Sequence, residues 1–174
     1  MGDEERLAQF EQAILPHLDA AYNLARWLTH NEHDAQDVVQ EAYLRAYQFF
    51  GGFHGEDGRA WILRIVRNTG YTWMEHNRRR KPAALDEENR PVASSDPGPD
   101  SDLMQSEDRQ LLGKALEELP REYREIVVLR DLEGLSYKEI AAVAGIPMGT
   151  VMSRLARARE RLQQSLTGRM NREP

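Results

Sequence analysis

The stretch LSYKEIAAVAGIPMGTVMSRLARARERL, residues 135–162, decides the fold of the C-terminal part of the chain. Ser136 and Glu139 have the spacing of a capping box, in which each side chain binds the backbone N–H of the other, so a short helix is expected there. Gly145 ends that helix. A longer helix, residues 148–166, follows the turn. A short capped helix, a tight turn and a longer basic helix are the pattern of a DNA-binding helix-turn-helix.

The longer helix is expected to have two chemically different faces. At 100° per residue, one apolar stripe faces inward. It consists of Val151, Leu155, Ala158 and Leu162. The opposite face carries mostly small side chains: Gly149, Met152, Ser153, Ala156 and Glu160. Such a compact face lets a helix approach the base edges in the major groove.

Basic residues border that compact face. Arg157 and Thr150 lie on one shoulder, and Arg157 is the best candidate for a bidentate contact with a base or a phosphate. Ser153 can supply a short hydrogen bond, and Arg154 and Arg161 flank the face within reach of phosphates. The alternative is an ordinary helical hairpin with a solvated basic face, since cations favour the C-terminal end of a helix.

The charge distribution supports contact with nucleic acid, although the net charge is −6. Residues 59–81 contain 7 Lys or Arg against 1 acidic residue, and residues 150–174 contain 6 against 2. Residues 82–110, between them, contain 2 basic against 8 acidic residues. Because binding follows local rather than total charge, two basic segments separated by an acidic one are compatible with DNA binding.

The chain divides into two helical blocks. Residues 81–105 contain four prolines and no aromatic residue, which predicts a flexible linker. We therefore expect an all-α protein with two small helical domains, residues 1–81 and 108–174, joined by an acidic linker, residues 82–107.

Both blocks show helical periodicity. The N-terminal block is expected to contain a helix kinked at Pro16, a helix capped by Asn31 or Asp34 that runs to about residue 49, and a helix over residues 59–79. The C-terminal block is expected to add a helix over residues 109–119 and another from Pro120 to Leu132.

Several function classes are excluded or disfavoured. The chain has no cysteine, its longest aliphatic run is four residues (126–129), and its N-terminus is acidic. We therefore expect no membrane insertion, no signal peptide and a cytoplasmic location. His30 and His33 could suggest a metal site, but no third ligand accompanies them. Without a Gly-rich phosphate loop or an acid/base constellation, we expect no enzyme, no cofactor and no metal.

Three segments of the C-terminal block resemble region 4 of the extracytoplasmic-function (ECF) sigma factors of the sigma-70 family. They are LEELP (116–120), EGLSYKEIA (133–141) and IPMGTVMSRLARAR (146–159). The resemblance implies that the last helix reads the −35 promoter element. By position, the residues facing bases would be Met152, Ser153, Ala156 and Arg157, with Thr150 and Arg154 beside them. Arg130 and the amide end of the helix at Tyr137 would hold phosphates. Met152 departs from the basic or polar residue of many relatives.

The N-terminal block resembles region 2 of the same family through DAQDVVQEAYLRAY (34–47), FHGEDG (53–58) and WILRIVRNT (61–69). The resemblance implies a face that docks on the polymerase clamp: Asp37, Gln40, Glu41 and Leu44. It also implies a loop that captures a base flipped from the −10 element, with Phe53, His54 and Gly55, and a base pocket at Asn68. Backbone contacts would come from Arg64, Arg67, Arg78, Arg79 and Arg80. Trp61 is expected to be a core residue.

As a whole, the resemblance implies a sigma factor that binds core RNA polymerase at its clamp and flap, recognises promoter DNA and is controlled by an anti-sigma factor. The alternative is a helix-turn-helix transcriptional regulator that is not a polymerase subunit. The N-terminal block lacks the βα alternation of a receiver domain, which disfavours that alternative. A protein-interaction module that no longer reads DNA also stays open, because Met152 and Ala156 carry little hydrogen-bonding information.

Overall fold

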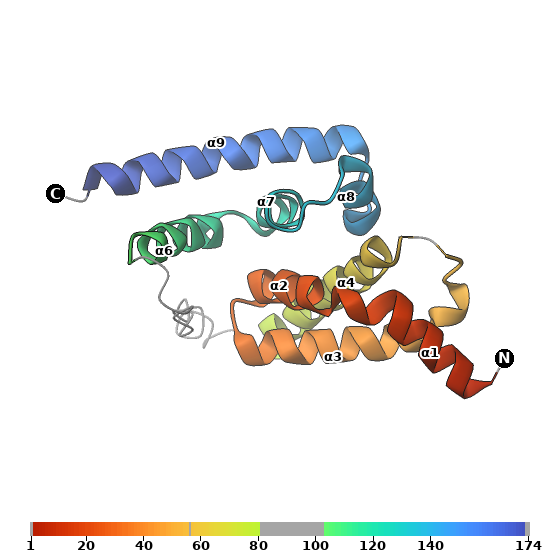
Figure 1. Ribbon diagram of the computed structural model, residues 1–174. Coiled ribbons are helices and arrows are strands. Elements are labelled where there is room, and N and C mark those ends of the chain that lie inside the picture. Colours follow the sequence, from red (N-terminus) through yellow and green to blue (C-terminus); the bar gives the residue numbers. More distant parts are fainter. Residues whose placement is uncertain (1, 56, 81–102, 173–174) are drawn as a thin grey trace.

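The computed structural model describes residues 2–55, 57–80 and 103–172. Within those residues all regular structure is helical, which confirms the expected all-α class. The helices form two stacked groups (Figure 1): α1 to α4 in one, and α6 to α9 in the other. Most of the predicted linker lies outside the described residues.

The N-terminal group begins with a helix broken at proline, as predicted. α1 (Asp3–Ile14) ends before the 3₁₀ turn η1 (Leu15–His17), and α2 (Leu18–Thr29) continues after it. Pro16 lies inside η1, where its missing N–H and fixed φ interrupt the α-helical hydrogen bonding.

The next two helices complete the N-terminal core. α3 (Glu32–Gln48) begins at Asn31, whose side chain accepts a hydrogen bond from the Asp34 N–H, so Asn31 is the cap. The 3₁₀ turn η2 (Phe50–Gly52) leads toward α4 (Gly58–Arg80). At Gly58 a Cβ atom would lie 2.6 Å from the Ala13 carbonyl oxygen, so a glycine is needed where α4 starts against α1.

The C-terminal group contains the predicted helix-turn-helix. It comprises α6 (Leu103–Glu118), α7 (Arg121–Val127), the π-helical turn η3 (Val128–Leu132), α8 (Tyr137–Ala144) and α9 (Met148–Arg172). α6 starts six residues earlier than expected, and η3 was not expected. Pro120 is the cap of α7 rather than its first residue, because its ψ of 147° is not helical. α9 extends beyond the predicted end at residue 166.

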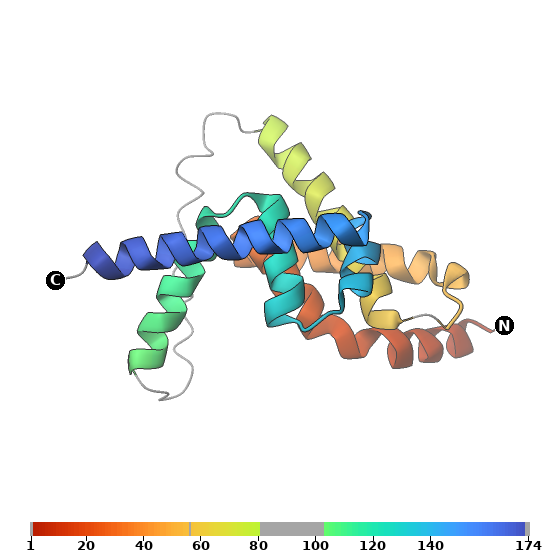
Figure 2. The ribbon, with the colours of Figure 1, turned by 90° about the horizontal axis from the view of Figure 1, so that it is seen from above.

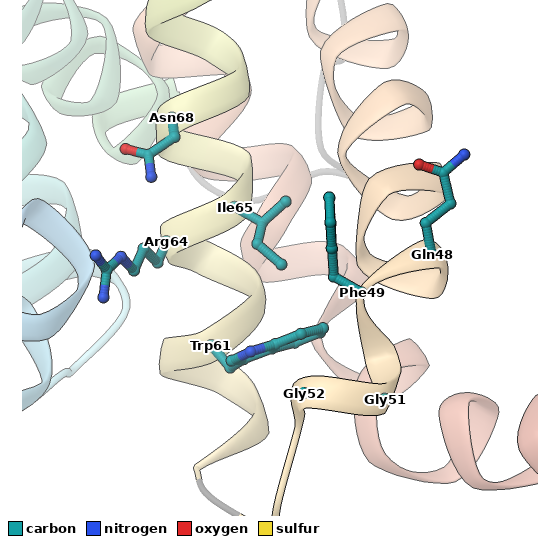
Figure 3. A pocket seen from close by; sticks show the side chains of 8 residues that line it. All are labelled: Gln48, Phe49, Gly51, Gly52, Trp61, Arg64, Ile65 and Asn68. Atoms are coloured by element: carbon teal, nitrogen blue, oxygen red, sulfur yellow. The ribbon is translucent and has the colours of Figure 1, made fainter.

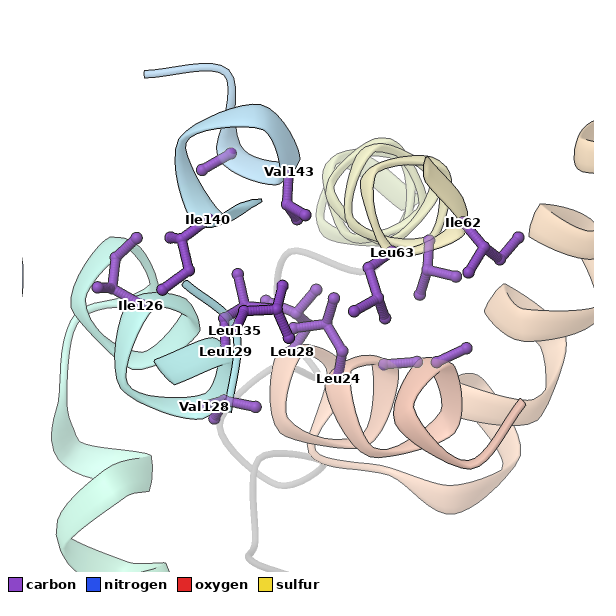
Figure 4. Packing of buried hydrophobic residues seen from close by; sticks show 14 of the residues in the cluster. Leu24, Leu28, Ile62, Leu63, Ile126, Val128, Leu129, Leu135, Ile140 and Val143 are labelled. Atoms are coloured by element: carbon purple, nitrogen blue, oxygen red, sulfur yellow. The ribbon is translucent and has the colours of Figure 1, made fainter. Parts of the chain in front are cut away.

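The two groups share one hydrophobic interface. α4 packs against α8, and α2 packs against α7. Figure 4 shows Leu28 and Leu63 of the first group beside Leu129, Leu135 and Val143 of the second. α9 crosses the second group on the side away from α2 and α3 (Figures 1 and 2), so this packing leaves its outer face uncovered.

Candidate nucleic-acid interface

The polarity predicted for the last helix is confirmed. The stripe Val151, Leu155, Ala158 and Leu162 is buried, with no side chain more than 7% exposed. The opposite residues are exposed, and Met152 is 47% exposed. They include Ser153, Ala156 and Arg157, while Thr150 and Arg154 are half-buried. α9 therefore presents a compact outer face with an arginine on its shoulder, which is the shape needed to enter a major groove.

The arginines of α9 differ in what they bind. Arg159 pairs with Asp131 at 2.6 Å, and the Arg161 guanidinium lies 4.8 Å from the centre of the Tyr123 ring. Within the described part of the chain, Arg157 and Arg154 have no hydrogen-bond or ion-pair partner. These two guanidinium groups are therefore available to an external anion, whereas Arg159 and Arg161 stabilise the bundle.

The start of α8 is held by two reciprocal hydrogen bonds. Ser136 Oγ accepts from the Glu139 N–H at 3.1 Å, and Glu139 Oε1 accepts from the Ser136 N–H at 2.9 Å, so both bonds of the capping box form as predicted. Arg130 donates to the Leu135 carbonyl oxygen at 2.8 Å and lies over the Tyr137 ring. This places the Arg130 cation beside the N-terminal end of α8, where a phosphate is expected.

The predicted docking residues share the outward face of α3. Asp37 and Gln40 are exposed and Leu44 is 62% exposed. Glu41 is half-exposed and binds Arg45 at 2.8 Å, one turn along the helix. An acidic face with one apolar anchor is thus open to a protein partner.

Phe53 and Trp61, two aromatic residues of the segments that resemble region 2, pack against the core. Phe53 is half-buried and stacks on Phe50, with ring centres 5.5 Å apart. The centres of the Trp61 and Phe53 rings are 5.2 Å apart, which agrees with the core role expected for Trp61. His54 and Gly55 are exposed, and Gly55 has a φ of 72°, so the loop tip remains accessible.

A hollow of about 610 Å³ lies between the end of α3 and α4 (Figure 3). Its lining contains Arg64 and Asn68, which the sequence had assigned to the −10 element. It also contains two residues that sequence reasoning missed, Gln48 and Phe49. Phe49 is 66% exposed, which the sequence alone does not reveal.

Arg67 forms an ion pair within the protein. Its guanidinium donates to both carboxylate oxygens of Glu125 at 2.9 and 3.2 Å, and it lies 4.1 Å from the centre of the Tyr71 ring. Glu125 is completely buried. The expected DNA contact of Arg67 therefore requires this ion pair to open. Arg78, Arg79 and Arg80 are exposed at the end of α4.

Further polar contacts join the two groups of helices. The buried Arg124 guanidinium donates to the carbonyl oxygens of Leu116, Glu117 and Leu119, and also to that of Trp27 across the interface. Burial lowers the pKa of Arg124 to about 10. Arg59 binds Glu139 at 3.2 Å, so the capping carboxylate of α8 is also tied to the start of α4.

The Glu139 carboxylate carries its charge over a wide pH range. A hydrogen bond from Asp57, with those from Ser136 and Arg59, lowers the pKa of Glu139 to about 2. The same contact raises the pKa of Asp57. Glu139 therefore keeps its charge to a lower pH than Asp57, and its carboxylate is the partner of Arg59.

Neither a metal site nor a membrane span is found in the ranges that the structure describes. No group of three or more His, Asp or Glu residues there is arranged to hold an ion. No described helix is both long and apolar enough to span a bilayer. His30 is the residue at which α2 ends, with a φ of 58°. Its Nδ1 atom lies 4.0 Å from Oε1 of Glu117. His33 is exposed.

The chain resembles known proteins over most of its length. Residues 13–80 match the family Sigma-70 region 2, and residues 109–162 match Sigma-70, region 4. The chain is 35% identical over 165 residues to the ECF RNA polymerase sigma factor SigE of Mycolicibacterium smegmatis, covering 95% of this chain and 64% of that protein's length. It is 36% identical over 141 residues to the ECF RNA polymerase sigma-E factor of Escherichia coli K12, covering 76% and 74%.

Two solved structures have a similar arrangement. The sigma factor RpoE of Bartonella quintana, in complex with the anti-sigma factor NepR, matches with a TM-score of 0.75 and 32% identity, over 91% of this chain and 97% of that one. CnrH in complex with the cytosolic domain of CnrY matches with a TM-score of 0.64 and 27% identity, over 91% and 88%.

Proposed function

The chain belongs to the ECF group of the sigma-70 family, and we propose that it carries core RNA polymerase to promoter DNA and starts transcription there. The observation that carries this proposal is the polarity of α9. Its apolar stripe is buried in its own bundle, and its compact outer face points to solvent, with Arg157 unpaired among the residues that the structure describes.

In this proposal α9 reads the −35 element. Met152, Ser153, Ala156 and Arg157 face base edges, and Thr150 and Arg154 lie at the border of the groove. Arg130, held beside the start of α8, contacts a phosphate that fixes the orientation of the helix. Arg157 carries most of the hydrogen-bonding information, because Met152 and Ala156 offer only apolar contact.

The N-terminal group performs the other two tasks. The face of α3 formed by Asp37, Gln40, Glu41 and Leu44 docks on the polymerase clamp. The hollow between α3 and α4 is lined in part by Asn68 and Arg64, and the loop tip at His54 and Gly55 is exposed. Asn68 hydrogen-bonds an unpaired base of the −10 element, and Arg64 contacts the DNA backbone.

The described arrangement is a closed one, and we propose that it opens when polymerase binds. Promoter elements about two helical turns apart cannot both be reached while α4 packs on α8. Arg67, assigned to DNA, is also held by the buried Glu125. Polymerase would hold the two groups of helices apart, so that binding by one raises the local concentration of the other.

We propose that an anti-sigma factor stabilises a closed arrangement. RpoE in complex with NepR superposes on this chain over both groups of helices, which supports the inhibitory character of the closed form. A stoichiometric partner that co-purifies with the native protein, and that reduces core binding when added back, is the expected result.

Dependence on core polymerase separates this proposal from that of a free-standing regulator. Fragmented genomic DNA is incubated with the chain alone, with core polymerase alone, and with both, and the bound fragments are sequenced. We expect a shared pair of motifs only when both are present. The same motif recovered by the chain alone would favour the regulator.

A further inference from the structure

Phe49 and Phe50 are neighbours in the sequence but lie in opposite environments. Phe50 is 8% exposed and packs on Phe10, Phe53 and Trp61. Phe49 caps the end of α3, and the residue is 66% exposed. In the described ranges, the ring contacts of the N-terminal core do not involve Phe49. Folding therefore makes little use of this aromatic ring.

The ring lies at the rim of the hollow between α3 and α4. Figure 3 shows Phe49 beside Ile65 and Trp61, which project toward it from α4. Arg64 and Asn68 extend from the other flank of α4 in the same view. An aromatic ring at the end of α3, and an amide and an arginine on α4, thus line the same hollow.

This combination suits unpaired nucleic acid. Successive bases stack on aromatic side chains, and an arginine beside them contacts the backbone. An amide side chain supplies both a donor and an acceptor for a base edge. Arg64 has no hydrogen-bond or ion-pair partner among the described residues, so its charge is free to bind a phosphate.

We propose that Phe49 is a stacking platform for a second unpaired promoter base, the neighbour of the base that Asn68 binds. The inference rests on the proposed function and deepens it. Stacking depends on the flat face of the ring and tolerates any base, so Phe49 stabilises the separated strand, while Asn68 discriminates between bases.

The test compares Phe49→Leu with Phe49→Tyr in complete holoenzyme. Leucine keeps the apolar character but removes the flat ring, whereas tyrosine keeps the ring. The control is Leu7→Ala, because Leu7 is 46% exposed on α1 and lies outside the hollow. The probe is a fork DNA made from a promoter fragment recovered with the holoenzyme, single-stranded on the non-template strand across the −10 element.

We expect Phe49→Leu to bind the fork about 5- to 150-fold more weakly, as for the loss of one stacked base, and Phe49→Tyr and Leu7→Ala to bind normally. Binding of a fully duplex −35 fragment and of core polymerase should not change. Normal fork binding by Phe49→Leu overturns the proposal, and so does weaker core binding with normal fork binding. If wild-type holoenzyme selects no promoter, the proposed function itself fails.

Discussion

At the scale of single residues, partners decide which side chains are available for function. Arg157 and Arg159 lie two positions apart on α9 with the same chemistry. Arg159 is held by Asp131 in a bidentate contact, with N–O distances of 2.6 and 3.3 Å. Arg157 has no such partner among the described residues. The two therefore form a matched pair, one arginine that we propose contacts DNA and one that is held within the bundle.

Arg157→Ala should weaken promoter-specific transcription by about 5- to 150-fold, the range expected for one bidentate base contact. Arg159→Ala should have a smaller effect on promoter choice. Binding of core polymerase, measured by titration with labelled chain, should be the same in both variants. Loss of core binding in Arg157→Ala would contradict its assignment to DNA.

The apolar stripe of α9 could be predicted from spacing alone, because each of its residues contacts the helix's own bundle. The partner of Arg67 could not. Glu125 lies 58 positions away, and no periodicity within α4 indicates it. Phe49 was missed for a related reason, since the hollow that it borders is formed by the meeting of α3, η2 and α4.

At the scale of secondary-structure elements, local signals were accurate wherever the hydrogen bonds are local. The capping box of α8, the break at Pro16 and the cap at Asn31 all use partners within a few residues. The π-helical turn η3 carries no such signal. The turn itself contacts both α2 and α8, and tertiary packing rather than sequence spacing determines it.

Glu41→Arg should weaken core polymerase binding while leaving α3 folded. The change reverses one charge on the outward face of α3 and breaks the pair with Arg45. An exposed helix pair of this kind contributes only about 0.3–0.5 kcal/mol, so the folded state should persist. The control is Glu11→Arg, the same charge reversal at an exposed position on α1. If Glu41→Arg binds core polymerase normally, the docking face is elsewhere.

At the scale of the whole molecule, a hydrophobic interface holds the two groups of helices together, and buried polar contacts cross it. Glu125 and Arg124 are both inside this interface, and each has its partners in place. The all-α class and the two blocks could be predicted from sequence. Their packing could not, since it depends on complementary surfaces distant in the chain. The division at residues 81 and 107 stays a prediction.

Glu125→Gln should shift the chain toward an open form. The amide cannot neutralise Arg67, and breaking a buried ion pair costs about 3–5 kcal/mol. Because the chain has no cysteine, dyes can be attached to Cys introduced at Leu7 and Gln164. We expect a longer dye separation in Glu125→Gln, with unchanged helix content by circular dichroism. Glu122→Gln, an exposed change on α7, is the control. A dye separation equal to that of the wild type would contradict the proposal that the Arg67–Glu125 ion pair stabilises the closed form.

Acid should favour opening through His30. Burial lowers the pKa of His30 to about 4, helped by Arg124, Arg26 and Arg121. In the open form the pKa of His30 is near 6.5, so between pH 6.5 and pH 4 the open form binds more protons than the closed form. The contribution of neutral His30 to closure is therefore fully present above about pH 6.5 and is lost as the pH falls toward 4.

The same pair of dyes measures this effect between pH 7.5 and pH 5. Burial raises the pKa of Glu117 in the closed form, so protonation of Glu117 favours closure. At the lowest pH values this opposes the opening caused by His30. In His30→Asn the titrating group is gone, and asparagine tolerates the left-handed backbone. We expect its dye separation to depend less on pH than that of the wild type. Equal pH dependence in both proteins would rule out His30.

The most direct measurement is transcription from a genomic fragment library with core polymerase, with and without the chain, and with every start site sequenced. The account predicts new transcripts only when the chain is present, starting at a fixed distance downstream of one paired −35 and −10 motif, and lost on Arg157→Ala. The same transcripts from core polymerase alone, or none in either reaction, would contradict it.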